Sequence, residues 1–193
     1  MKLSKIKKAI QGNKTWILVN RDDGGQWIGD GAAVYAVPEN IDMTAVNAPT
    51  ILDIAPDKAA EYFVSVVNEP PEWYDNLPRE GEEDVLIPQA TVVYADHQIE
   101  IMTTREGVCV MLDAAYLAPA MDAEAGVGYT LRRRVNAETG EPMEPIVAVY
   151  DDMTVCALVA PLHKNVAEGV WNELRKACAP GLVYALGGGG DDA

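Results

Sequence analysis

Residues 143–162, MEPIVAVYDDMTVCALVAPL, decide the fold of this chain. Ile146–Tyr150 and Thr154–Ala160 are rich in β-branched and other apolar residues, which favours strands over helices. Asp151 and Asp152 supply a short polar turn between them, so the segment predicts a hairpin. Both faces of these strands are apolar. Such a hairpin must be covered on both sides or lie in the middle of a covered sheet, and the rest of the chain has to provide that cover.

Composition indicates an ordinary globular protein. The 193 residues allow one large domain or two small ones, and 49% are hydrophobic and 23% charged. No apolar run approaches the roughly 18 residues needed to span a bilayer, and the basic start, MKLSKIKKAI, alternates charged and apolar residues as an amphipathic helix does. We therefore expect no membrane partner. Cys109, Cys156 and Cys178 form an odd, widely spaced set without a disulfide or zinc pattern, which fits a reducing cytoplasm.

The first part of the chain predicts a helix followed by a meander of three strands. A helix is expected over 2–11, and strands over 16–20, 26–28 and 33–37, with Asp-Gly turns between the strands.

A second helix is expected after the meander. Asp42 is placed to cap it, with Ile41 and Val46 as a hydrophobic staple. Pro49 either kinks that helix or restarts it from Asn47.

Residues 59–68 are ambiguous between helix and strand, and their aromatic and β-branched residues favour the strand. Residues 69–83 are rich in proline and acid and predict a linker, so we place a domain boundary there. Trp73 and Tyr74 in this linker either fold back onto the body or form a loop that docks a partner.

The second part of the chain predicts more strands and two helices. Strands are expected at 90–95, 98–104, 108–112 and 129–135. Asp113 caps a short helix over 114–121, and Asn165 caps a longer one that ends at Pro180. The glycine-rich tail 187–193 is expected to be flexible. Overall we predict an α+β fold of antiparallel sheets with short helices packed on one face, in two similar halves over 1–68 and 84–186.

Catalytic patterns are absent from the sequence. His97 and His163 lack spaced carboxylates or cysteines, and no GxSxG, Walker, GxGxxG or HExxH motif occurs. Tyr150-Asp151-Asp152 superficially matches a polymerase metal motif, but a hairpin turn explains it. An enzyme is therefore disfavoured, and we expect neither cofactor nor metal.

Charge placement suggests a different activity. The net charge is −15, which over a uniform surface would repel nucleic acid. Cations nevertheless gather on the two terminal helices and in one arginine run, where they are either a solvated face or a surface for phosphates. The candidate DNA contacts are Lys2, Lys5, Lys8, Arg132, Arg134, Lys164, Arg175 and Lys176.

Three segments resemble the DNA sliding clamps, the processivity factors of replicative polymerases. Val108–Met121 is similar to the strand and helix that open the last half-domain of bacterial clamps. Ala157–His163 is similar to the run that closes those clamps, and Trp27–Tyr35 resembles a clamp meander. The opening helix matches the place of the first channel-lining helix, and the short length would suit a phage or prophage replication cassette.

The resemblance implies a homo-oligomeric ring around duplex DNA, with basic helices lining the hole and sheets forming the outer wall. Its partners would be duplex DNA and a DNA polymerase. A second hypothesis keeps the fold but makes it a protein-binding scaffold that acts through Trp73 and Tyr74. A third, an acidic DNA mimic, is weaker, because the carboxylates cluster in a loop rather than along one surface.

Overall fold

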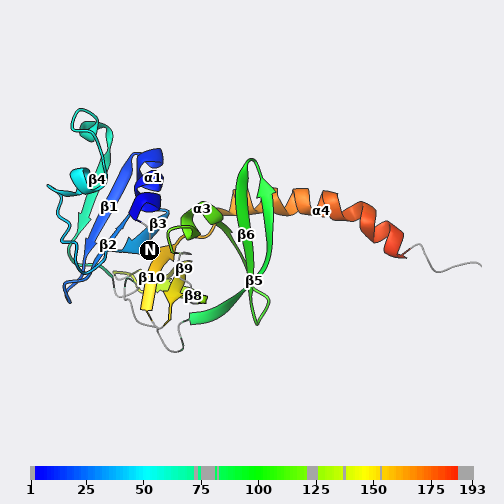
Figure 1. The fold of residues 1–193 in the computed structure, drawn as a ribbon. Helices are drawn as coiled ribbons and strands as arrows, with labels where there is room; N and C mark the ends of the chain where they lie inside the picture. Colours follow the sequence, from blue (N-terminus) through cyan, green and yellow to red (C-terminus); the bar gives the residue numbers. More distant parts are fainter. Residues whose placement is uncertain are drawn as a thin grey trace, which may run out of the picture. The chain divides into compact units, whose positions relative to one another are not determined.

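The computed structural model describes residues 3–71, 74, 81, 83–120, 126–136, 138–152 and 154–186, with side chains in the last helix up to Ala177. The chain divides into two compact units, Met1–Pro161 and Leu162–Ala193. The first unit is built on a large sheet with short helices, which confirms a mixed α+β fold (Figure 1).

The described residues form the following elements. The helices are α1 (Leu3–Asn13), α2 (Ala48–Ile51), the 3-10 turn η1 (Ala59–Glu61), α3 (Ala114–Leu117) and α4 (Lys164–Leu186). The strands are β1 (Thr15–Asn20), β2 (Gln26–Gly29), β3 (Ala33–Ala36), β4 (Phe63–Val67), β5 (Glu83–Tyr94), β6 (His97–Thr104), β7 (Cys109–Asp113), β8 (Val127–Val135), β9 (Pro142–Asp151) and β10 (Thr154–Val159). They form a ten-stranded sheet in the order β4-β1-β2-β3-β10-β9-β8-β5-β6-β7.

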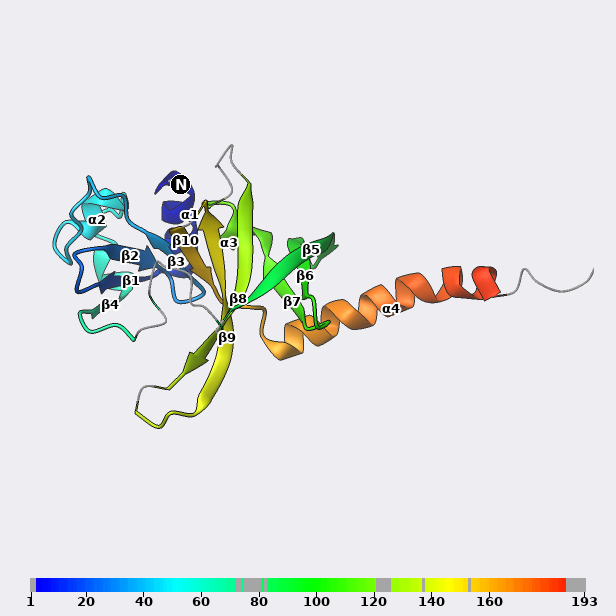
Figure 2. The same ribbon diagram turned by 90° about the horizontal axis from the view of Figure 1, so that it is seen from below.

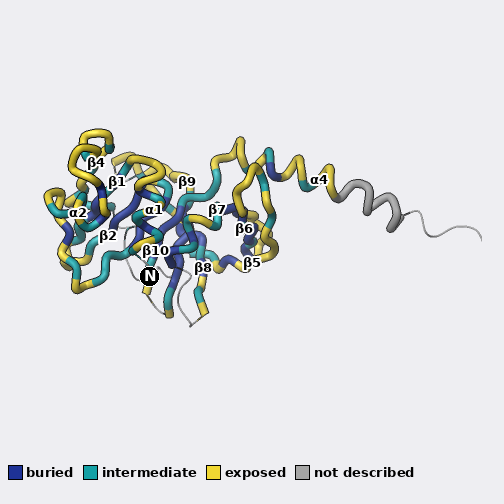
Figure 3. The backbone as a smooth tube through the Cα atoms, turned by 45° about the horizontal axis from the view of Figure 1, so that its top comes forward, coloured by how far each residue is buried: buried dark blue, intermediate teal, exposed yellow. Residues whose placement is uncertain are grey.

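The predicted hairpin is confirmed as β9 and β10, and it lies in the middle of the sheet. Val147 and Val149 join one buried cluster, whereas Ile146, Ala148 and Tyr150 join the cluster on the opposite face. Both faces are therefore covered, as the apolar pattern requires, and Figure 3 shows buried backbone concentrated along these central strands.

The helices of the first unit cover one face of the sheet. The larger cluster contains Ile6 and Ile10 of α1, Ala48 of α2 and Leu117 of α3. Among the described residues, the smaller cluster on the other face receives no helix residue; Tyr74 packs there instead. Figure 2 shows α1 and α3 next to β10.

The predicted meander is confirmed as the antiparallel strands β1, β2 and β3. The preference for a strand within 59–68 is also confirmed, because Phe63–Val67 forms β4. β4 pairs parallel to β1 and ends the sheet on that side.

The second helix is much shorter than expected. Asp42 does not cap it, and Val46 is 89% exposed, so the predicted hydrophobic staple is wrong. Instead α2 begins after Asn47 with Pro49 in its first turn, which is the restart alternative. Thr44 and Asn47 exchange hydrogen bonds and form a turn over 45–47 just before the helix.

The sheet does not divide into two halves at 69–83. β3 pairs with β10, which joins the first strands of the chain to the last. β5 begins at Glu83, pairs with β8 through its first residues and with β6 through the rest. The predicted boundary therefore falls inside the first unit, and the division lies between Pro161 and Leu162.

The second unit contains α4, whose ends differ from the prediction. His163 caps the helix: its carbonyl accepts from the amides of Val166 and Ala167, and its Nδ1 accepts from the amide of Asn165, which lies inside the helix. The helix also continues through Pro180 to Leu186. An internal proline removes one backbone hydrogen bond, which this helix tolerates. The tail 187–193 lies outside the described residues.

None of the described helices combines the length and the apolar character needed to cross a membrane.

Candidate nucleic-acid interface

α1 has one buried and one exposed side because its apolar residues recur every three to four positions. Ile6 and Ile10 are fully buried against the sheet. Lys8 points away from this stripe and is exposed, as the helical period requires. Within the described part of the chain Lys8 makes no ion pair, whereas the neighbouring Lys7 pairs with Asp53.

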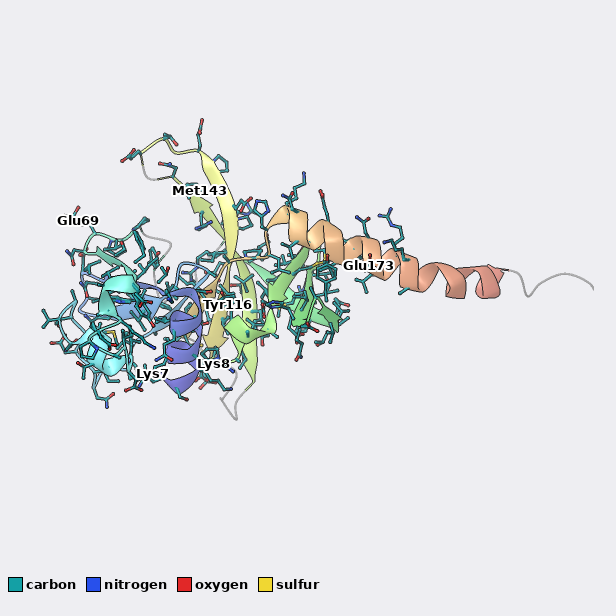
Figure 4. All side chains as sticks on the ribbon, turned by 90° about the horizontal axis from the view of Figure 1, so that it is seen from above. Lys7, Lys8, Glu69, Tyr116, Met143 and Glu173 are labelled. Carbon is teal, nitrogen blue, oxygen red and sulfur yellow. The ribbon has the colours of Figure 1, made fainter. Side chains whose placement is uncertain are left out.

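α1 and α3 are joined by polar contacts across more than 100 residues of sequence. The Lys5 ammonium donates to the carbonyl of Ala118 at 2.9 Å, just beyond the end of α3. The Asn13 side-chain amide donates to the Tyr116 hydroxyl, also at 2.9 Å. Figure 4 labels Lys8 on α1 and Tyr116 on α3 beside it. The two helices are therefore held against each other at both ends of α1.

Asp30 organises the end of α1 from the turn between β2 and β3. It is 8% exposed, and one carboxylate oxygen accepts from the amides of Ala32 and Ala33. The other oxygen accepts from the side-chain amide of Asn13, the residue that also contacts Tyr116. The carboxylate thus fixes the turn and orients the side chain that links the helices.

Tyr35 of β3 contacts α3 from the sheet. Its hydroxyl donates to the carbonyl of Tyr116 at 2.8 Å. Burial, aided by the nearby Asp30 and Tyr116, raises the pKa of the Tyr35 hydroxyl far above its usual value, so this group remains a neutral donor. The link therefore persists across the physiological pH range.

Asp113 starts α3, as predicted. Its Oδ1 accepts from the amide of Ala115 at 2.9 Å, and its Oδ2 lies 2.7 Å from Nδ1 of His97. The helix has only four residues, so this cap supplies a large share of its local stability.

We expect Asp113→Ala to lower the free energy of unfolding by about 1 kcal/mol, the usual cost of losing an N-cap. Asp113→Asn should retain most of the stability, because asparagine caps equally well and loses only the His97 contact. His97 is 64% exposed, so this ion pair contributes little. Urea unfolding followed by circular dichroism measures both variants; an equal loss in both would assign the effect to the ion pair.

Arg132 was a candidate DNA contact, and the structure shows that this is wrong. Its side chain is fully buried and pairs with the nearly buried Glu83, with 2.7 Å between Nε and Oε1. Its cross-strand partner is Ile146, so it lies on the face opposite to the helices. The alternation of side chains along β8 predicts that Arg132 and Arg134 share one side of the strand. It does not reveal that the carboxylate of Glu83, 49 residues away in sequence, lies on that side.

Arg134 also lies on the face away from the helices, so its prediction as part of the same DNA surface is wrong. It is half-buried, donates from Nε to the carbonyl of Glu144 at 2.6 Å, and lines a small cavity with Tyr74 and Ile146. Burial lowers the pKa of the Arg134 guanidinium from its ordinary value.

Tyr74 does not extend from a docking loop. It packs with the smaller buried cluster, and burial raises the pKa of its hydroxyl. The interpretation in which the aromatic residues fold back onto the body is confirmed for Tyr74, which removes the structural basis of a docking site at that residue. Trp73 and Lys2 lie outside the described residues.

The remaining predicted contacts belong to the second unit. Arg175 is exposed on α4. Lys164 lies 3.9 Å from Glu168, and Lys176 lies 2.7 Å from Glu173, both as pairs along the helix. These pairs fit a solvated helix face. That these cations share one surface with Lys5 and Lys8 stays a prediction.

The polar junction between α1 and α3 was not predicted, because its partners are far apart in sequence and of common types. Across the described residues, no group of three or more His, Cys, Asp or Glu side chains is placed to hold a metal ion. Comparison with family models, with curated proteins and with solved structures yielded no match to this chain.

Proposed function

We propose that this chain is a clamp-like processivity factor that assembles around duplex DNA and tethers a polymerase to it. The observation that carries the proposal is the pairing of α1 with α3 on one face of the sheet, which is antiparallel except for the pair β1–β4. Lys5 and Asn13 hold this pair together. Two short helices on a sheet give a wall with a helical inner side, which is what an encircling protein needs.

The charge distribution supports encirclement rather than tight binding. Lys8 is the exposed, unpaired cation of the described part of α1, and the whole chain carries −15. Each neutralised phosphate changes the logarithm of the binding constant by about 0.9 per tenfold change in salt concentration. A protein with few such contacts therefore binds DNA weakly. Retention would then come from topology, with Lys8 keeping the helix side compatible with DNA.

A duplex with a removable block at each end tests this proposal. The protein is mixed with linear duplex biotinylated at both ends, streptavidin is added, and unbound protein is removed at high salt. We expect retention on the blocked duplex and release when a restriction enzyme cuts between the blocks. Equal retention on blocked and cut duplex would contradict encirclement.

Lys8→Glu is expected to weaken association with open-ended duplex and to reduce the salt slope by about 1 for each copy that contacts DNA. The reason is the loss of one phosphate contact and the addition of a repelled carboxylate. Lys58→Glu makes the same charge change outside α1 and should leave the slope unchanged. Fluorescence anisotropy over a salt series measures both. If the two variants behave alike, net charge rather than the α1–α3 face controls binding.

A further inference from the structure

Among the described residues, β4 is an apolar strand at the end of the sheet, and no strand pairs with its outer side. It lies at the end of the strand order, with β1 as its neighbour. Its sequence, FVSVV, contains no charge and no proline, and its pairing with β1 has no bulge. Proteins usually protect an edge strand with a charge, a proline or a bulge, because an unprotected edge pairs with other strands.

The side chains of β4 are exposed on both faces of the sheet. Phe63 is 65% exposed, Val64 43% and Val66 39%. Val64 and Val66 stand opposite Trp16 and Leu18 of β1 and so belong to the face that carries the helices, whereas Phe63 faces the other way. A strand placed against β4 would cover apolar surface on both sides.

The backbone of β4 presents its free groups at two residues. The amide of Phe63 donates to the carbonyl of Lys14, toward β1. Because successive residues of a strand alternate, Ser65 and Val67 also face β1, whereas the N–H and C=O groups of Val64 and Val66 face outward. Two outward residues match the hydrogen-bonded positions of an antiparallel partner.

We propose that β4 pairs with β4 of a second copy of this chain, antiparallel and centred on Ser65. In this register Val64 faces Val66 of the second copy as a hydrogen-bonded pair, and Phe63 faces Val67 of the second copy. Ser65 faces its own equivalent at a position without ladder bonds, where side chains approach closely. Every pair within the strand is apolar with apolar, or serine with serine.

The carboxylates that flank β4 lie outside the ladder of this register. Glu61 belongs to the 3-10 turn η1 rather than to β4, and the exposed Glu69 follows β4 (Figure 4). Carboxylates that are brought near one another repel. The charge of Glu61 is offset within each copy, because its Oε2 lies 2.5 Å from the Lys14 ammonium. The two-fold operation repeats this arrangement at the other end of the strand.

The interface between the two copies is small, so we expect a weak dimer. Stable specific interfaces bury about 1,200–2,000 Å² in total, and a five-residue strand edge supplies less. The dimer should therefore form and dissociate with concentration. Pairing through β4 does not depend on DNA binding. A protein that pairs through β4 but does not encircle DNA would contradict only the proposed function. A protein that encircles DNA without pairing through β4 would contradict only the β4 dimer.

Disulfide formation tests the register. In the full chain with Cys109 and Cys178 replaced by serine, Ser65→Cys should form a covalent dimer on mild oxidation, because the two sulfur atoms meet at the two-fold axis. Val64→Cys should not link to itself. A mixture of Val64→Cys and Val66→Cys chains should link to each other, since these residues face each other across the interface. Equal linking of all single variants, or none at Ser65→Cys, would overturn the proposal.

The solution mass provides an independent measurement. Sedimentation velocity over a concentration series should show a shift from monomer to dimer. Val66→Pro removes an N–H that β1 does not use, and Val64→Lys adds a repelled charge, so both variants should remain monomeric with unchanged circular dichroism. Val46→Lys makes the same exchange at a residue that is 89% exposed outside β4 and should still dimerise. Dimerisation that survives Val66→Pro and Val64→Lys would place the interface elsewhere.

Discussion

Arg132→Met is expected to lower the free energy of unfolding by about 3–5 kcal/mol, because it leaves a buried carboxylate without its countercharge. The exposed fractions of the Arg132 and Glu83 side chains are 0% and 6%. Thr130 donates to the same carboxylate at 2.6 Å, and Tyr150 donates to it as well. Hydrogen bonds of these neutral hydroxyls do not replace the positive charge.

The pair matters because of its place in the sheet. Glu83 begins β5, and its Cα partner on β8 is Arg132. The ion pair therefore joins β5, and with it β6 and β7, to β8, which lies beside the central hairpin. Loss of the pair should weaken the join between β5 and β8 first, which amide hydrogen exchange along these two strands can detect.

Arg133→Met is the matched control. Arg133 is the next residue, its side chain is 67% exposed, and it lies 3.4 Å from Asp84. Surface pairs of this kind contribute about 0–1 kcal/mol. The double replacement Arg132→Met with Glu83→Leu should recover much of the lost stability, since an apolar pair has no buried charge. Urea unfolding compares the variants. Similar losses for Arg132→Met and Arg133→Met would contradict the assignment.

Gly29→Ala is expected to cost about 3 kcal/mol, the upper end of the range for overpacking. A Cβ atom at Gly29 would lie 1.8 Å from the carbonyl oxygen of Ala33 and 2.7 Å from the Cα atom of Val34. Both are backbone atoms of the neighbouring strand, so no side-chain rotation relieves the clash. The displaced carbonyl also accepts from the amide of Asp30, whose carboxylate holds Asn13 at the end of α1.

Gly12→Ala is the control for this prediction. Gly12 lies in α1, and a Cβ atom there would meet nothing within 4 Å. Alanine is favoured over glycine within a helix, so the free energy of unfolding should rise by up to about 0.5–1 kcal/mol. Thermal and urea unfolding measure both variants. The same substitution should thus have opposite signs at the two positions, and a neutral Gly29→Ala would show that β2 and β3 are less closely apposed.

Local patterns in the sequence predicted the strands and turns well. Alternation and turn residues identified the hairpin of β9 and β10 and the meander of β1 to β3, and both faces of the hairpin are covered. Asp113 was correctly predicted as a cap because capping depends on neighbouring residues. The start of the second helix was predicted wrongly, because the weak helical preference of this segment yields to the turn formed by Thr44 and Asn47.

The candidate site could be predicted only in part. The helical period placed Lys8 on the exposed side of α1, since that position depends on α1 alone. Arg132 and Arg134 were predicted to lie on the DNA surface because charged side chains are normally exposed. Instead Arg132 pairs with Glu83, and Arg134 donates to the carbonyl of Glu144, on the opposite face of the sheet. Such partners are remote in sequence, and alternation does not show which face of a strand the helices will cover.

The sequence by itself determined the elements of this protein, because propensity, period and turn chemistry act between residues that are close along the chain. Tertiary structure alone decided that β10 lies beside β3, that α1 meets α3, and that β4 is left as an edge. Those outcomes depend on which distant surfaces fit together while burying apolar side chains and pairing every buried charge. No short stretch of residues contains that information.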